Sequence, residues 1–248
     1  MKLKRYKKEY DYSYTLGQYP TIELLKYKPE HVRQLVFHSK FSNSEGARVI
    51  DELMAGSDVA VEWNDRLVET LSPKKNCYVV GVFDKYYSSL DAGADHVVLV
   101  NPSDNGNLGT LLRTMLAFEV ENLAIISPAV DVFSPEVIRA SMGALFRVNV
   151  EYMDDIQVYR SEFDRPLFLF MTDGDQSLEE AAWQHPAGLV FGNESSGLPA
   201  EYRGLGRNVY LPQSDKVDSL NLAVAAGIVL SRRYTHVGAV REPPLQAI

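Results

Sequence analysis

The chain has 248 residues, and 46% of them are hydrophobic, which is enough for one large domain or two small ones. No apolar run follows the basic first residues and no stretch is long enough to span a membrane, so we expect a soluble, cytoplasmic protein with no membrane partner. The single cysteine, Cys77, excludes internal disulfides, and the five histidines lack metal-ligand spacing, so no metal is expected.

The net charge of −8 argues against a simple nucleic-acid-binding protein, which would carry a basic surface. The charge is unevenly distributed, because residues 1–85 hold 14 Lys and Arg against 12 Asp and Glu, whereas the remainder holds 11 against 21. Five of the first eight residues are basic, namely Lys2, Lys4, Arg5, Lys7 and Lys8. This basic arm is either an RNA-contacting segment or simply a solvated terminus.

The first third of the chain has the pattern of a small α/β unit. Strands are predicted over residues 32–38, 59–61 and 77–83, a capped helix over Ser44–Gly56, and a second helix over 64–71. Residues 84–95 show no clear period and contain the pair Ala92-Gly93, which is typical of a linker. We therefore predict a domain boundary near residues 85–94.

From residue 95 onwards, short apolar strands alternate with helices. The predicted strands are His96–Val100, Leu123–Ser127, Leu167–Met171, Leu189–Gly192 and Val209–Leu211. This alternation predicts a parallel sheet covered by helices on both faces. Ligands of such sheets bind outside the carboxyl ends of the strands, and polar loops follow three of these strands, at 172–174, 192–199 and 211–221.

Two stretches combine a polar turn with a helix. In the first, residues 105–107 form a turn before an apolar helix, with Asn107 as its natural cap. Arg113 follows six residues later, about 600° around a helix, so the two share a face only if Asn107 lies in the preceding loop. In the second, residues 217–221 precede a buried helix, and such polar helix starts either cap the helix or hold a ligand.

Several common ligand motifs are absent from these loops. The NGNLG turn does not supply the G-x-G-x-x-G dinucleotide fingerprint, and no phosphate-binding P-loop with its lysine occurs. A hydrolase nucleophile elbow needs glycine two residues before its serine, but Asn193 stands two before Ser195. The remaining turns, with the carboxylate of Glu194, suit a small polar ligand that carries an adenine and a charged amino-acid end.

Three ordered motifs resemble the SpoU-type (TrmH-like) branch of the SPOUT RNA methyltransferases. NLGTLLRT at 107–114 is similar to the first family motif, VFGNESSGLP at 190–199 to the second, and LP followed by SLNLAVAAGI at 219–228 to the third. RASMGALFRVNV at 139–150 resembles a further family segment, and the whole resemblance covers residues 95–235. The chain departs from the family pattern at Glu119, where glycine is usual, and at 213–216, which lack the usual glycine.

The resemblance implies a parallel α/β sheet whose C-terminal part is threaded as a deep trefoil knot, which general topology rules would exclude. It divides the chain into a small α/β ribosomal-protein-like substrate-binding domain at 1–88 and a catalytic domain at 95–248. The implied activity is transfer of a methyl group from S-adenosylmethionine to a ribose 2′-hydroxyl of tRNA or rRNA. The implied assembly is a homodimer with the active site at its interface, and DNA is not expected as a partner.

By the same resemblance, the catalytic residues are Asn107, Arg113, Glu194, Ser219 and Asn221. Thr172, Gly192, Leu211 and Leu220 would hold the cofactor, and a side chain at Gly192 would fill the ligand's space. Arg113 would either bind the phosphate beside the target ribose, oriented by Asn107, or accept a proton after being neutralised in a cationic pocket. The alternatives are a catalytically silent RNA-binding or ribosome-assembly protein on the same scaffold, and a methyltransferase that acts on a protein or small molecule.

Overall fold

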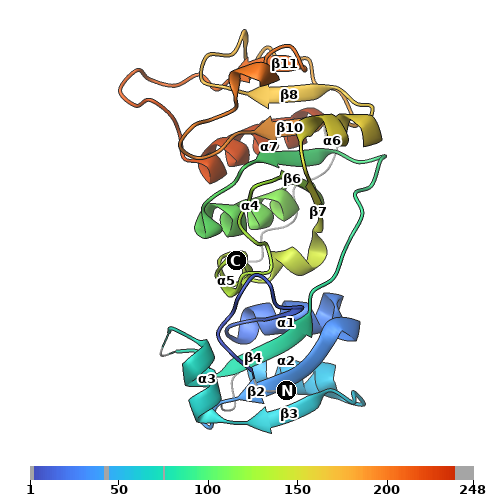
Figure 1. The fold of residues 1–248 in the computed structure, drawn as a ribbon, viewed down its shortest axis with the longest axis vertical. Helices are drawn as coiled ribbons and strands as arrows, with labels where there is room; N and C mark the ends of the chain where they lie inside the picture. The colour runs from blue at the N-terminus through green and yellow to red at the C-terminus, as the bar shows by residue number, and fades with distance from the viewer. Residues whose placement is uncertain (1–2, 42–44, 75, 238–248) are drawn as a thin grey trace.

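The computed structural model describes residues 3–41, 45–74 and 76–237, and its strands form a four-stranded and a seven-stranded sheet (Figure 1). The smaller sheet has the order β1-β4-β2-β3, in which β1 and β2 run antiparallel to β4 and β3 runs parallel to β2. Its elements are β1 Tyr12–Tyr14, α1 Gln18–Tyr27, the 3-10 helix η1 Pro29–His31, β2 Val32–Phe37, α2 Glu45–Met54, β3 Ala60–Trp63, α3 Asp65–Leu71 and β4 Val79–Asp84.

Helices cover both faces of this smaller sheet. Residues of α1 and α2 form one apolar cluster with β2 and β4, while α3 and β1 form a second cluster with the alternate residues of the same strands. The predicted strands at 32–38, 59–61 and 77–83 and the two predicted helices are confirmed, although Ser44 lies outside the described residues. The sequence pattern did not reveal α1, because its cap position, Gly17, contributes no side-chain hydrogen bond, and because Pro20, which the first turn tolerates, is untypical of a helix interior.

The larger sheet has the order β7-β6-β5-β10-β8-β11-β9, and every neighbouring pair is parallel, which confirms the predicted sheet type. Helices α4, α5 and α7 pack on one face, and α6 with the 3-10 helix η3 packs on the other. The elements are β5 His96–Val100, α4 Asn105–Ala117, β6 Asn122–Ile126, α5 Pro135–Ala140, η2 Ala144–Arg147, β7 Asn149–Met153, α6 Ile156–Glu162, β8 Leu167–Phe170, β9 Gln176–Ser177, β10 Gly188–Phe191, η3 Ala200–Tyr202, β11 Arg207–Tyr210 and α7 Leu222–Val237.

The segment between the two sheets is packed against the larger unit. The ring of Phe83, at the end of β4, lies 5.2 Å from that of Phe146, and the Tyr86 ring lies 5.1 Å from that of Phe133. Lys85 Nζ lies 2.8 Å from a carboxylate oxygen of Asp131, which also accepts a hydrogen bond from the Tyr6 hydroxyl. The loop predicted as a linker therefore joins two units that share one apolar core.

The start of α4 corrects the prediction that Asn107 caps this helix. Asp104 is the N-cap, and its side chain accepts a hydrogen bond of 2.7 Å from the backbone N–H of Asn107. Asn107 thus lies inside the first helical turn, and Arg113, six residues later, projects about 120° away from it around the helix. The two residues do not share a face of α4.

The two departures from the family pattern have different consequences for the backbone. Glu119 follows the end of α4 and has φ of 56°, a left-handed conformation in which glycine is normally favoured at a helix end. Within the described residues, none of positions 213–216 has a positive φ, so this loop does not require glycine. The left-handed backbone at position 119 therefore favours the glycine that is usual in the family, whereas the backbone at 213–216 does not favour it.

Gly109, in the first motif, allows α4 to lie close to α5. A Cβ atom at this position would meet Ala140 Cβ at 2.4 Å, Val137 O at 2.8 Å and Ser141 N at 2.9 Å. We expect Gly109→Ala to lower the free energy of unfolding by about 1–3 kcal/mol, because the added methyl group overpacks this contact. Thermal and urea unfolding would measure the loss. Thr110→Ala, at an exposed neighbour, is the control and should change stability by less than about 0.5 kcal/mol; equal stability of both variants would contradict the prediction.

Candidate functional site

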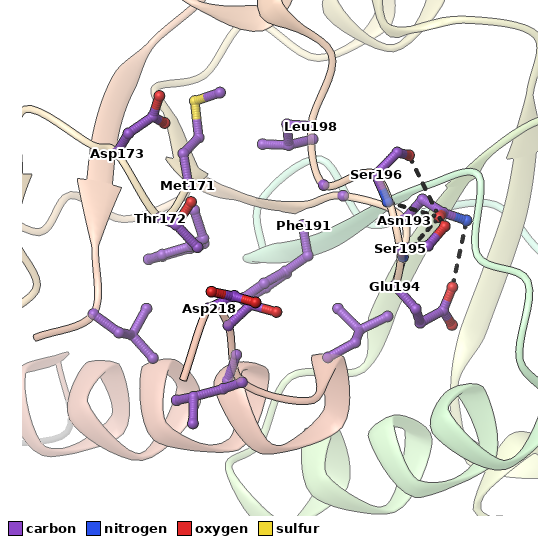
Figure 2. Close-up of a pocket in the computed structure, with 18 of the residues that line it drawn as sticks. Met171, Thr172, Asp173, Phe191, Asn193, Glu194, Ser195, Ser196, Leu198 and Asp218 are labelled. Atoms are coloured by element: carbon purple, nitrogen blue, oxygen red, sulfur yellow. Dashed lines mark hydrogen bonds between the residues drawn. The ribbon is translucent and has the colours of Figure 1, made fainter. Parts of the chain in front are cut away.

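A pocket of about 460 Å³ opens at the carboxyl edge of the larger sheet (Figure 2). Its walls are the loops after β8, β10 and β11 and the first residues of α7. The four residues predicted to bind a cofactor, Thr172, Gly192, Leu211 and Leu220, all line it. The rings of Phe170 and Phe191 stack with their centroids 4.7 Å apart and form an apolar wall. The pocket lies where parallel sheets generally place their ligands.

The loop after β10 folds back on itself in a tight turn. Asn193 and Gly197 exchange backbone hydrogen bonds of 3.1 and 2.9 Å, and the Asn193 side chain accepts hydrogen bonds from the N–H and hydroxyl of Ser195. A Cβ atom at Gly192 would meet Gly197 C at 2.1 Å and Leu198 N at 2.2 Å. Glycine at position 192 is therefore required by the loop's own backbone, and the expectation that a side chain here would also fill the ligand's space stays a prediction.

Glu194 joins this loop to the loop that follows β5. Its carboxylate accepts hydrogen bonds from Ser103 N at 3.0 Å, Ser103 Oγ at 2.8 Å and Asp104 N at 3.2 Å. Partial burial raises the pKa of this carboxyl, but hydrogen bonds from its own N–H and from Ser103 and Asp104 outweigh burial, so that the pKa lies below its ordinary value. Glu194 is consequently ionised at neutral pH and acts as an acceptor between two loops.

Asn107 extends the network from Glu194 to α7. Its side-chain N–H donates to Glu194 over 3.4 Å, and its carbonyl oxygen accepts a hydrogen bond of 2.8 Å from the side chain of Asn221. Asn221 in turn caps α7, because its oxygen accepts from Ala223 N at 2.9 Å and Val224 N at 3.3 Å. Three of the five residues predicted to be catalytic therefore form one hydrogen-bonded chain that connects the three motifs.

The two other predicted catalytic residues lie outside this chain. Ser219 is exposed and lines the pocket. Arg113 is exposed on another face of α4, and it makes no hydrogen bond or ion pair with any residue in the described ranges. The structure thus does not bring Arg113 against Asn107, and orientation of Arg113 by Asn107 within one chain is wrong.

Two charged residues of the pocket were not among the predicted site residues, although Asp173 lies in the predicted polar loop at 172–174. Asp173 and Arg203 form an ion pair at its rim, and both line it. Arg203 follows η3, outside the three motifs, and it meets Asp173 because the segment after β10 lies beside the loop after β8, the neighbouring strand in the sheet. The pattern of apolar residues along the chain carries no signal for this pair.

Neither a metal centre nor a membrane span is found in the part of the chain that the structure describes. No group of three or more His, Cys, Asp or Glu side chains is suitably placed to hold a metal ion. None of the described helices combines the length and the apolar character that a bilayer crossing needs.

Residues 95–231 match the model of the SpoU rRNA Methylase family. The chain belongs to this family. It is 31% identical over 144 residues to a 23S rRNA (uridine(2479)-2'-O)-methyltransferase of Streptomyces viridochromogenes, covering 54% of this chain and 50% of that protein. It is also 32% identical over 149 residues to a tRNA (cytidine(34)-2'-O)-methyltransferase of Beijerinckia indica, covering 58% of this chain and 92% of that one. The chain spans about half the length of the first curated relatives that it matches.

Solved structures similar to this SpoU family chain cover nearly all of it. The AdoMet-bound rRNA methyltransferase of Sinorhizobium meliloti is 26% identical with a TM-score of 0.75, and the match covers 92% of this chain and 88% of that one. The SpoU methyltransferase AviRb of Streptomyces viridochromogenes is 21% identical with a TM-score of 0.78. The match covers 92% of this chain and 91% of that one, and the two share the fold.

The role of Glu194 as an ionised acceptor predicts a pH-dependent effect of Glu194→Gln. At pH 7 we expect the variant to lose about 1–3 kcal/mol of stability, because its amide N–H groups would oppose the backbone donors of Ser103 and Asp104. Because folding lowers the pKa of the Glu194 carboxyl, its ionised form stabilises the fold at pH values above the ordinary pKa of 4.5. This stabilisation is lost as the pH falls through the lowered pKa. The difference between wild type and variant should therefore shrink in acid.

Thermal unfolding between pH 3 and 7 would measure this difference. Glu162→Gln, at an exposed glutamate on α6, is the matched control and should leave stability within about 0.5 kcal/mol at every pH. A Glu194→Gln effect that is the same at pH 3 and pH 7 would contradict the assigned charge state.

Proposed function

We propose that the protein transfers a methyl group from S-adenosylmethionine to a ribose 2′-hydroxyl of tRNA or rRNA. The observation that carries this proposal is that the loops after β8, β10 and β11 all contribute to the same pocket. The relatives named as rRNA and tRNA 2'-O-methyltransferases and the AdoMet-bound similar structure support it.

The pocket suits S-adenosylmethionine in size and in chemistry. Its volume of about 460 Å³ lies in the range typical of small-ligand sites. The apolar side chains of Phe191, Leu198 and Leu220 would cover the adenine, and Thr172, Gly192 and Leu211, at the strand ends, would offer backbone groups to the polar parts. When bound, S-adenosylmethionine supplies a methyl group activated by a positively charged sulfur.

The residues of the chain would position the ribose and help to remove its proton. The chain of Glu194, Asn107 and Asn221 would hold the motif loops in place, and Ser219 would hold the end of the third loop beside the pocket. A guanidinium with a pKa above 12 is a poor base, so Arg113 would bind the phosphate beside the target ribose, and that phosphate would assist deprotonation. Because Arg113 projects away from Asn107, we propose that it serves the pocket of a second subunit.

Arg113→Ala should reduce methyl transfer to the true RNA substrate by at least about a thousandfold, since positioning and proton-transfer help are both lost. Affinity for S-adenosylmethionine should stay within about twofold, because Arg113 does not line the pocket. A tritiated-methyl assay on tRNA and rRNA and calorimetry would measure the two quantities. Arg160→Ala, at an exposed arginine on α6, is the control and should retain full activity. Transfer by Arg113→Ala within tenfold of wild type would remove Arg113 from the mechanism, and no transfer by the wild type would favour the catalytically silent alternative.

The exposed face of α7 supports the proposal of a homodimer. Val224 and Ile228 are 52% and 43% exposed, and they line a shallow hollow together with Phe118 and Gly227. Adjacent exposed apolar side chains on a helix of the catalytic unit are typical of a surface that another protein covers. A second copy packed here would bury both residues and lie next to the start of α7, which forms one wall of the pocket.

Ile228→Glu should convert the dimer to a monomer and abolish methyl transfer, because it would bury a charge at this apolar interface. Size-exclusion chromatography with light scattering would measure the mass, and the melting temperature should stay close to that of a wild-type monomer at high dilution. Val158→Glu introduces the same charge at an exposed valine on α6 and should leave the mass unchanged. A variant that keeps the mass and activity of wild type would reject this interface.

We further propose that residues 1–88 form a ribosomal-protein-like domain that presents RNA to a catalytic domain at 95–248. Lys4, Arg5, Lys7 and Lys8 are all exposed in the basic arm. Arg5 and Lys8 also donate to the backbone oxygens of Thr70 and Ala129, and Lys2 lies outside the described residues. The insertion of β10 between β5 and β8 supports a C-terminal part threaded as a deep trefoil knot.

An RNA substrate and a single, unpaired cysteine favour a cytoplasmic location.

A further inference from the structure

More negative than positive side chains line the pocket, and the negative ones differ in whether they have a hydrogen-bond or ion-pair partner. Three carboxylates, Asp173, Glu194 and Asp218, face it, and among the described lining residues Arg203 is the one cation. Asp173 pairs with Arg203. The Glu194 carboxylate accepts hydrogen bonds from Ser103, Asp104 and Asn107, so it is already engaged in joining loops.

Asp218 is the carboxylate that the described chain does not compensate. Its side chain is exposed and makes no hydrogen bond or ion pair with any residue in the described ranges; only its backbone oxygen accepts a hydrogen bond, from Gln213 over 3.3 Å. Figure 2 shows Asp218 in the segment that leads into α7, with its carboxylate turned into the pocket. A ligand that fills the pocket would therefore meet the unpaired negative charge of the residue that precedes Ser219.

We propose that Asp218 is the residue by which the pocket binds the positively charged cofactor more tightly than its uncharged-sulfur product. This inference rests on the proposed function. S-adenosylmethionine carries a positive charge on sulfur that S-adenosylhomocysteine lacks, while the amino-acid end of the two molecules is the same. A carboxylate near the sulfur stabilises only the first, and the attraction strengthens when the ligand displaces water from the pocket. Asp218 thus favours the substrate and speeds the release of the product.

Two alternative placements of the Asp218 charge give different results. If the carboxylate faced the ammonium of the amino-acid end, its loss would weaken both ligands equally. If it faced water, its loss would weaken neither. Preference for the sulfonium also predicts that salt lowers the affinity for S-adenosylmethionine more than that for S-adenosylhomocysteine, because dissolved ions screen the attraction.

Calorimetry on the full chain with three ligands tests the inference. The ligands are S-adenosylmethionine, S-adenosylhomocysteine and sinefungin, which carries a protonated amine in place of the sulfonium methyl. We expect Asp218→Asn to weaken S-adenosylmethionine and sinefungin about tenfold and S-adenosylhomocysteine less than twofold, and to lose the salt-dependent preference. Asp218→Glu keeps the charge and should retain most of the preference for both cationic ligands.

Asp215→Asn is the matched control, because Asp215 lies in the same loop and is exposed but does not line the pocket. It should bind all three ligands as the wild type does, and unfolding temperatures should verify that each variant is folded. An equal loss for all three ligands, or no loss for any, would overturn the role of Asp218 while leaving the proposed function intact. A wild-type chain that binds none of the three would overturn the proposed function and this inference with it.

Discussion

The carboxylate of Glu194 is the interaction on which the arrangement of the site depends. It receives two backbone N–H groups from the loop after β5 and one side-chain N–H from Asn107, and Asn107 then holds Asn221 at the start of α7. A carboxylate suits this position because it only accepts hydrogen bonds and offers several acceptor sites. The loop after β5 and the loop after β10, about ninety residues apart in sequence, are thereby joined through the Glu194 carboxylate. This connection helps to fix the shape of the pocket.

The smaller unit is fixed against the larger one by buried aromatic contacts and a charged cluster. Phe83 and Tyr86 enter the core that α4 and α5 cover, and Asp131 accepts hydrogen bonds from Tyr6 and Lys85. These contacts pack the smaller sheet directly against the unit that carries the pocket. If the smaller unit presents RNA, as we propose, the target ribose is positioned by a rigid scaffold rather than by a flexible tether.

The acidic balance of the chain beyond residue 85 fits a cationic cofactor better than it fits RNA. Residues beyond 85 hold 21 acidic against 11 basic side chains, and the pocket itself repeats this excess. RNA phosphates would be repelled from such a surface, so the exposed Arg113 and the basic residues of the arm would have to attract them locally. If the proposed function is correct, separate regions of charge would let one protein bind a positive cofactor and a negative substrate.

The order of apolar strands, polar loops and helices determined the parallel sheet and placed polar loops at its carboxyl edge, because these follow from local periodicity and chain direction. The resemblance to the SpoU motifs, rather than periodicity, pointed to Thr172, Gly192, Leu211 and Leu220, which line the pocket. Single residues depended on the tertiary structure. Asn107 proved to lie within α4 because Asp104 takes the cap, and Gly192 is needed because Gly197 and Leu198 approach it. The face of Arg113 and the pairing of Asp173 with Arg203 likewise depend on helix register and strand neighbours, which local sequence patterns do not encode.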